Sequence, residues 1–224
     1  MSWQAVFDEF QQKEIKFARL YVGEFGHSHS LHFSHAFSYS IIAKLAGLLD
    51  RLESASGAGI PYATEWRLPI TGDPVLWYLA QGHGAGHTGD DWNLKTGGDT
   101  DLGETVVSVA QGLVVYAGPG RGTWGNLVIV AYREMQGDLT CWRYAHLLDV
   151  GVKVGATVRA GQRLGSVGKG GGDAWAAHLH LDARIGGLFD PSEWLRNKPL
   201  WFNPLTFLEA RGVEVGLIEK RYRV

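Results

Sequence analysis

The stretch "VGVKVGATVRAGQRLGSVG", residues 150–168, bears most directly on the fold. Apolar residues and glycines alternate along it, at Val154, Gly155, Val158, Gly161, Leu164 and Gly165. Glycine accepts the positive φ angles that tight turns need, and short apolar runs between such turns are typical of strands. The stretch therefore predicts short strands joined by tight turns.

The same character extends along most of the chain. Apolar runs separated by glycine-containing turns occur at 105–118 ("TVVSVAQGLVVYAG"), 126–134 ("NLVIVAYRE"), 139–147 ("LTCWRYAHL") and 176–184 ("AAHLHLDAR"). This pattern favours an antiparallel sheet, sandwich or small barrel over βαβ units. We predict a mainly β domain over residues 62–212. The spacing in 150–168 resembles the repeat of biotinyl and lipoyl carrier domains, but the Met-Lys-Met setting of a carrier lysine is missing, so it supports only the fold type.

The two ends of the chain differ from this middle part. Residues 3–22 and 37–52 space their apolar side chains as amphipathic helices do, so we expect residues 1–58 to form an N-terminal helical segment of two helices. "ESASGAGIP" (53–61) has the composition of a linker. Residues 213–224 are expected to be a C-terminal extension that packs on the β domain.

Composition narrows the class of protein. The 224 residues are 45% hydrophobic with a net charge of −2, which is typical of a soluble globular protein without a nucleic-acid partner. The single cysteine, Cys141, excludes an internal disulfide and a cysteine-based zinc cluster, and its apolar neighbours predict a buried thiol. No signal peptide is visible, because "MSWQAVFDEFQQKEIKF" (1–17) lacks a basic start and an unbroken apolar run. No membrane span is visible either, because "SIIAKLAGLLDRL" (40–52) is short and contains Lys44. The oligomeric state is not indicated.

Two histidines, His178 and His180, lie one residue apart in an apolar run. On a strand they would share a face, roughly 6.6–6.8 Å apart, either as buried core histidines or beside a metal. His87 and Asp91 add a H-x-x-x-D pattern. A catalytic zinc takes three protein ligands such as imidazoles and carboxylates, plus a water, and two histidines with one aspartate meet that count. His146, in phase with its strand neighbours, could reach the same cleft.

Several further residues have more than one interpretation. His27, His29, His32 and His35 read as structural or solvated residues, with a weaker hypothesis that one of them donates to the metal and silences the site. His83 lies in a glycine-rich loop near the candidate site. The D-x-D of "KTGGDTDLGE" (95–104) reads as a solvated loop rather than a calcium site, since no complete ligand loop follows.

Together, "GHTGDDWN", "WGNLVIV", "RYAHL", "VKVGATVRAGQRLGSVG", "HLHLDAR" and "FNPLTFL" resemble, in this order, the lysostaphin-type (LytM-like) zinc endopeptidases, over residues 66–208. The resemblance implies a barrel-sandwich hybrid fold and one zinc ion per chain. It implies that His87, Asp91 and His180 bind the zinc, that His178 acts on the bound water, and that His146 assists. Which of His178 and His146 is the general base stays open.

The resemblance also implies a function. Members of the family cut peptide bonds, usually in the cross-bridges or stem peptides of bacterial peptidoglycan, which places them in the periplasm, the cell wall or the medium. The alternative is a non-catalytic peptidoglycan-binding or hydrolase-activating module of the same fold. Such modules normally lack one or more of the five site residues, and this sequence has all five.

Overall fold

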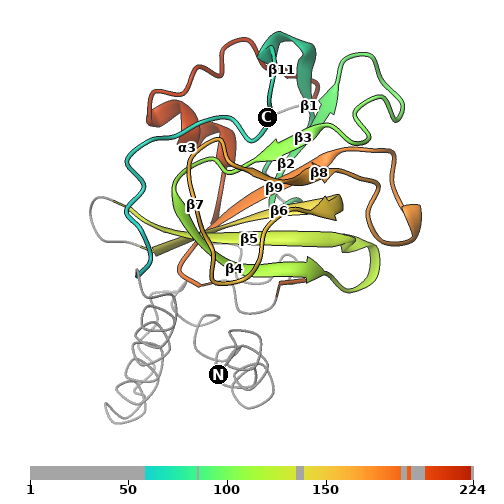
Figure 1. The fold of residues 1–224 in the computed structure, drawn as a ribbon. Helices are drawn as coiled ribbons and strands as arrows, with labels where there is room; N and C mark the ends of the chain where they lie inside the picture. The colour runs from blue at the N-terminus through green and yellow to red at the C-terminus, as the bar shows by residue number, and fades with distance from the viewer. Residues whose placement is uncertain (1–58, 85, 135–138, 188–190, 193–199, 223–224) are drawn as a thin grey trace, which may run out of the picture. The chain divides into compact units, whose positions relative to one another are not determined.

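A computed structural model describes residues 59–222, apart from 85, 135–138, 188–190 and 193–199. The described chain is mainly β, as predicted, and it forms one eleven-stranded sheet with a single α-helix (Figure 1). The predicted N-terminal helices, and with them His27, His29, His32 and His35, lie outside the described residues. The strands are β1 (Trp77–Gln81), β2 (Gly89–Leu94), β3 (Thr105–Val107), β4 (Gly112–Pro119), β5 (Asn126–Arg133), β6 (Leu139–Val150), β7 (Thr157–Val158), β8 (Arg163–Val167), β9 (Leu179–Ile185), β10 (Trp201–Phe202) and β11 (Glu219–Lys220).

The strand order brings distant motifs together. The main path through the sheet is β11-β1-β2-β9-β6-β5-β4-β7, while β8 pairs with β3 and β6, and β10 pairs with β9. All of these pairings are antiparallel except that of β1 with β11. Strands β2, β9 and β6 are therefore neighbours, although they begin at residues 89, 179 and 139.

A continuous apolar core supports these strands. Its largest members are fully buried aromatic side chains, Trp77, Trp92, Trp142, Tyr132 and Tyr144. The hydroxyls of Tyr132 and Tyr144 lie 3.0 Å apart and complete a buried chain with Ser108. Cys141 is buried on β6 and makes no disulfide, as expected.

The stretch 150–168 forms the short strands β7 and β8 with turns between them, as its pattern predicts. Gly161 has a φ of +76°, which a side chain would strain. Gly165 lies so close to β6 that a Cβ would sit 2.3 Å from the carbonyl oxygen of Asp149. Glycine is needed here once for a turn and once for close strand approach.

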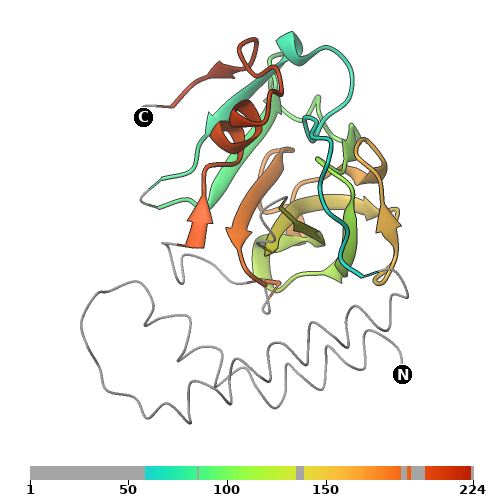
Figure 2. The ribbon, with the colours of Figure 1, turned by 90° about the vertical axis from the view of Figure 1, so that its left-hand side faces the viewer.

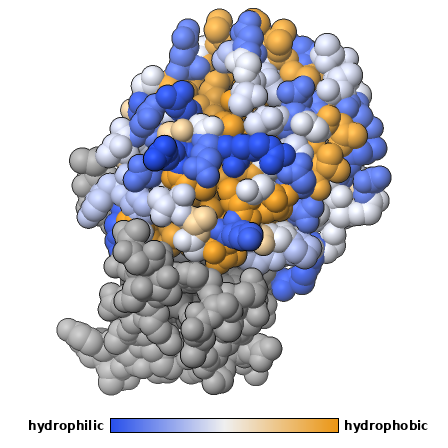
Figure 3. Space-filling model, in the orientation of Figure 1, coloured by the Kyte–Doolittle hydropathy of each residue, from blue (hydrophilic) through white to orange (hydrophobic). Residues whose placement is uncertain are grey.

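The C-terminal part of the described chain adds a helix and an edge strand to the sheet. Helix α3 (Pro204–Ala210) begins at Asn203, whose side chain caps the Thr206 amide, and it packs beside β2 and β9 (Figure 2). Strand β11 then joins the edge of the sheet beside β1. No helix in the described residues is long and apolar enough to cross a membrane. Hydrophilic and hydrophobic residues are interspersed on the face shown in Figure 3.

Candidate metal centre

Strand register places three of the predicted site residues side by side. Asp91 on β2 and His180 on β9 are direct cross-strand partners. His87 lies four positions before Asp91, where a two-way backbone bridge with Gly84 holds it just ahead of β2. The Nδ1 of His87 donates to the carbonyl of Gly82 at 3.2 Å, which leaves its Nε2 facing Asp91.

The donor atoms of this triad converge. One ligand atom from each of His87, Asp91 and His180 lies within 4.8 Å of the other two. Asp91 Oδ1 is 2.8 Å from Nδ1 of His180 and 3.2 Å from Nε2 of His87. Two imidazole nitrogens and a carboxylate oxygen make up the donor set of a catalytic zinc. The three residues therefore fit a zinc ion that leaves one coordination position open.

Hydrogen bonds at the triad shift the pKa values of Asp91 and His180. Burial by itself would raise the pKa of Asp91, but hydrogen bonds with His180 and His87 outweigh it and hold that pKa well below its usual range. Burial likewise lowers the pKa of His180, but hydrogen bonds to Asp182 and Asp91 raise it to about 9. A metal ion that binds the imidazole of His180 must displace this proton, so binding releases a proton.

The other two predicted histidines lie beside the triad. His178 donates from Nδ1 to the carbonyl of Ala176 at 2.9 Å, and its Nε2 is 3.8 Å from Asp91 Oδ1. His146 donates from Nδ1 to the carbonyl of Trp124 at 3.2 Å, and its ring centroid is 4.7 Å from that of His178. Burial, with the neighbouring His180 and His178, lowers the pKa of His146 to about 3. Each ring, when neutral, thus presents an unprotonated Nε2.

The backbone of His146 is unusual. Its φ is +62°, and among the described non-glycine residues only Asp173 shares a positive φ. The pairing of β5 with β6 shifts register across it, between Tyr144 and Leu147. The expected phase with its strand neighbours Trp142 and Tyr144 would direct His146 into the core, where both are buried, so that reason for its place in the cleft was wrong. The bulge instead turns its ring to the cleft, at a conformational cost of roughly 1–2 kcal/mol.

Asp182, which is not among the predicted site residues, supports His180 from the side away from Asp91. It follows His180 by two positions on β9, so a period of two in "HLHLD" predicts that it shares the face of the histidines. Its Oδ2 accepts hydrogen bonds from His180 Nε2 at 3.0 Å and from Thr88 Oγ1 at 2.7 Å. Arg143 donates to both of its oxygens, from Nε at 3.1 Å and from Nη2. Both Arg143 and Asp182 are fully buried.

All five predicted residues line one cavity of about 580 Å³. Its walls come from Gln81, Gly86, His87, Asp91, Arg121, Gly122, Thr123, Trp124, His146, Trp175, His178 and His180. The glycine-rich segments 118–126 and 168–176 both contribute to this lining. Of the tryptophans beside the motifs, Trp124 and Trp175 line the cavity, whereas Trp92 is buried in the core.

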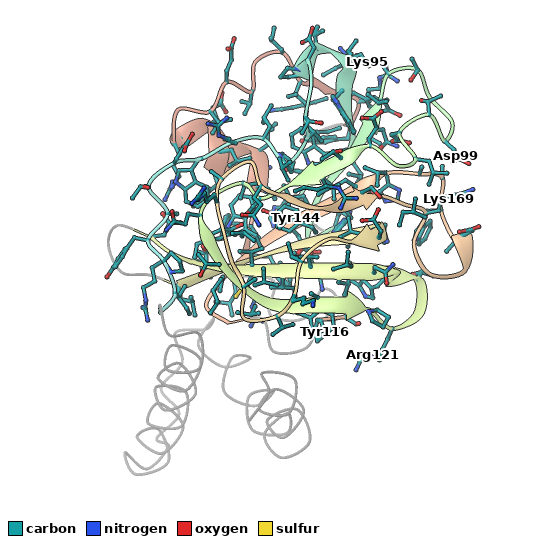
Figure 4. All side chains as sticks on the ribbon, viewed as in Figure 1. Lys95, Asp99, Tyr116, Arg121, Tyr144 and Lys169 are labelled. Carbon is teal, nitrogen blue, oxygen red and sulfur yellow. The ribbon has the colours of Figure 1, made fainter. Side chains whose placement is uncertain are left out.

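The other residues singled out in the sequence, Asp99, Asp101 and His83, lie around the candidate site without joining the triad. Asp99 accepts from Lys169 Nζ at 2.9 Å and from the Ala177 amide at 2.8 Å, so it anchors the cavity wall (Figure 4). Asp101 is buried, which raises its pKa to about 6. Neither belongs to a group of metal-ligating side chains in the described residues. His83 lines a neighbouring cavity, and burial lowers its pKa.

Comparisons with known proteins point in one direction. The model of the family described as Peptidase family M23 matches residues 86–191. The cell division protein DipM of Caulobacter vibrioides is 35% identical over 130 residues, which are 58% of this chain and 19% of that protein. The lipoprotein NlpD of Yersinia enterocolitica is 32% identical over 85 residues, which are 38% of this chain and 81% of that protein.

Solved structures are also similar. The antimicrobial peptidase lysostaphin from Staphylococcus simulans matches with a TM-score of 0.49 and 25% identity, over 64% of this chain and 54% of that chain.

Proposed function

Because this chain belongs to peptidase family M23, we propose that it is a zinc-dependent endopeptidase that hydrolyses peptide bonds of bacterial peptidoglycan, in cross-bridges or stem peptides. Membership confirms the resemblance seen in the sequence motifs. The observation that carries the proposal is the convergence of His87, Asp91 and His180 in a cavity that also presents two further histidines. A peptidoglycan substrate implies a place of action in the cell envelope or outside the cell.

His87, Asp91 and His180 would hold the zinc ion, one per chain. A zinc ion bound there lowers the pKa of a water toward about 7 and polarises the scissile carbonyl. The protein fixes the direction of each ligand from behind. Gly82 fixes the ring of His87 through Nδ1, and Asp182 fixes the ring of His180 through Nε2.

Proton transfer falls to His178 and His146. Each ring donates a hydrogen bond from Nδ1–H to a backbone carbonyl, so Nε2 is the atom that can accept a proton. We assign the first acceptance, from the attacking water, to Nε2 of His178, which lies close to Asp91. His178 then passes that proton to the leaving amine as the peptide bond breaks, and His146, whose ring lies beside that of His178, assists this transfer.

A digest tests the proposal. Purified protein should contain one zinc per chain, and peptidoglycan treated with it should release new peptide fragments identified by mass spectrometry. His180→Ala should lose both zinc and activity. His178→Ala should keep its zinc while hydrolysis falls about 10²–10⁴-fold, the usual range for a general acid–base group.

Two outcomes would contradict these assignments. A zinc-loaded protein that binds peptidoglycan but releases no fragment would support the non-catalytic module instead. Loss of zinc from His178→Ala, with retention in His180→Ala, would reverse the roles of the two histidines.

A further inference from the structure

A second cavity adjoins the candidate metal centre. It has a volume of about 380 Å³ and shares Gln81, Gly86 and His87 with the lining of the first cavity. Its remaining lining residues are Gly82, His83, Gly84, Asn203, Thr206, Lys220 and Tyr222. The two cavities are therefore neighbours, and a Cβ placed on Gly86 would have no atom within 4 Å.

The far wall of this cavity comes from the C-terminal segment. Lys220 on β11 is the cross-strand partner of Leu79 on β1, and the next amide, that of Arg221, donates to the Leu79 carbonyl at 3.0 Å. The ring of Tyr222 lies where a Cβ of Gly82 would be, which brings the segment against the loop before His87. Residues 219–222 lie outside the part of the chain that matches the M23 family model.

The cavity has a distinct charge. Among the described residues that line it, Lys220 carries the one formal charge, and none is Asp or Glu. Asp90, which lies close by, is fully buried, and its two oxygens accept from the backbone amides of His83 and Leu205. No ion pair joins Lys220 to another described residue, whereas the neighbouring Glu219 pairs with Lys95 and Arg221. Since the whole chain has a net charge of −2, this cationic lining is a local property.

We propose that the second cavity is a substrate subsite that binds a carboxylate of the peptide, with Lys220 as the cationic partner. The proposal rests on the proposed peptidase function and adds to it a preference for acidic peptides. Besides Lys220, the lining includes residues with neutral hydrogen-bonding side chains, Gln81, Asn203 and Thr206. An ammonium with neutral donors beside it and no facing carboxylate favours an anionic group over a neutral or cationic one.

Paired peptides test the subsite. Synthetic peptides reproduce short segments of peptidoglycan stem peptides and cross-bridges, with glutamate or glutamine placed in turn at each position along each segment. The wild type should prefer the glutamate member at one position by about three- to tenfold in KM, with kcat nearly unchanged, as expected for an exposed ion pair. Lys220→Met should abolish this preference, Lys220→Arg should keep it, and Lys220→Glu should reverse it.

Lys153→Met is the matched control, because it removes one exposed lysine that lines neither cavity. Its preference should equal that of the wild type. Gly86→Leu should raise KM for the preferred peptide, because it adds a large side chain at a residue that lines both cavities.

The two proposals fail in different ways. If neither peptide of any pair is cleaved, the peptidase function fails, and calorimetric binding of the same pairs to the zinc-loaded protein still decides the subsite. A glutamate preference that persists in Lys220→Met, or its absence from the wild type in both cleavage and binding, would overturn the subsite.

Discussion

Replacing Asp182 by asparagine should weaken zinc binding more than any other conservative change behind the metal centre. The carboxylate accepts hydrogen bonds from His180, Thr88 and Arg143. An asparagine side chain has two orientations here. In the first, its NH₂ faces Arg143 Nε, which loses its acceptor on residue 182. In the second, its NH₂ faces His180 Nε2. In the second orientation His180 must move its proton to Nδ1, the atom that faces Asp91 and the metal position.

The magnitudes follow from this geometry. Loss of a supporting hydrogen bond behind a metal-binding histidine typically costs 10–100-fold in metal affinity, or about 1.4–2.7 kcal/mol. Arg143 also becomes a buried charge without its full counter-ion, and removal of one partner of such a pair costs about 3–5 kcal/mol of folding free energy. Because both members are fully buried, solvent does not screen this loss.

Two measurements separate the effects. Urea unfolding of the metal-free protein gives the stability change, and competition with a chromophoric chelator gives the zinc dissociation constant. Glu65→Gln is the control: this exposed carboxylate pairs with the exposed Arg67 away from the cavity, so the stability should change by about 0–1 kcal/mol and the zinc affinity not at all. Thr88→Val, which removes one donor to Asp182, should give an intermediate zinc affinity.

One result would refute this reasoning. If Asp182→Asn binds zinc as tightly as the wild type while the metal-free protein is destabilised, Asp182 serves only the fold and does not position His180.

Three further outcomes are expected. Gly171→Ala should destabilise the protein by about 1–3 kcal/mol in urea unfolding, since a Cβ there would lie 2.1 Å from the carbonyl oxygen of Gly122; an unchanged stability would show that the two loops part easily. Asp99→Ala removes the acceptor of Lys169 Nζ and of the Ala177 amide, which anchors the cavity wall. The KM for peptide should therefore rise while Tm changes little. The control Lys153→Met should change neither KM nor Tm. Zinc at 100 times its dissociation constant should add about 2.7 kcal/mol to stability and raise Tm by roughly 5–10 °C in a thermal melt, and a chelator should remove this gain.

Local pattern was sufficient for the class of fold. Alternating apolar residues and glycine turns predict short strands, and β7 and β8 follow the pattern of 150–168 directly. Strand pairing could not be predicted in the same way, because β2 and β9 are neighbours in space while about ninety residues separate Asp91 from His180.

For the candidate site, too, the sequence predicted some features and only the tertiary structure decided others. The sequence motifs, through their resemblance to a family of zinc peptidases, predicted His87, Asp91, His146, His178 and His180 as site residues, whereas the residue pattern alone left buried core histidines as an alternative. The structure brings these five residues to one cavity. The tertiary structure decided how His146 reaches the cleft, because a bulge with positive φ breaks the alternation that would direct its ring to the core. It also decided that Arg143 and Thr88 converge on Asp182, since such contacts depend on register between strands and not on spacing within one.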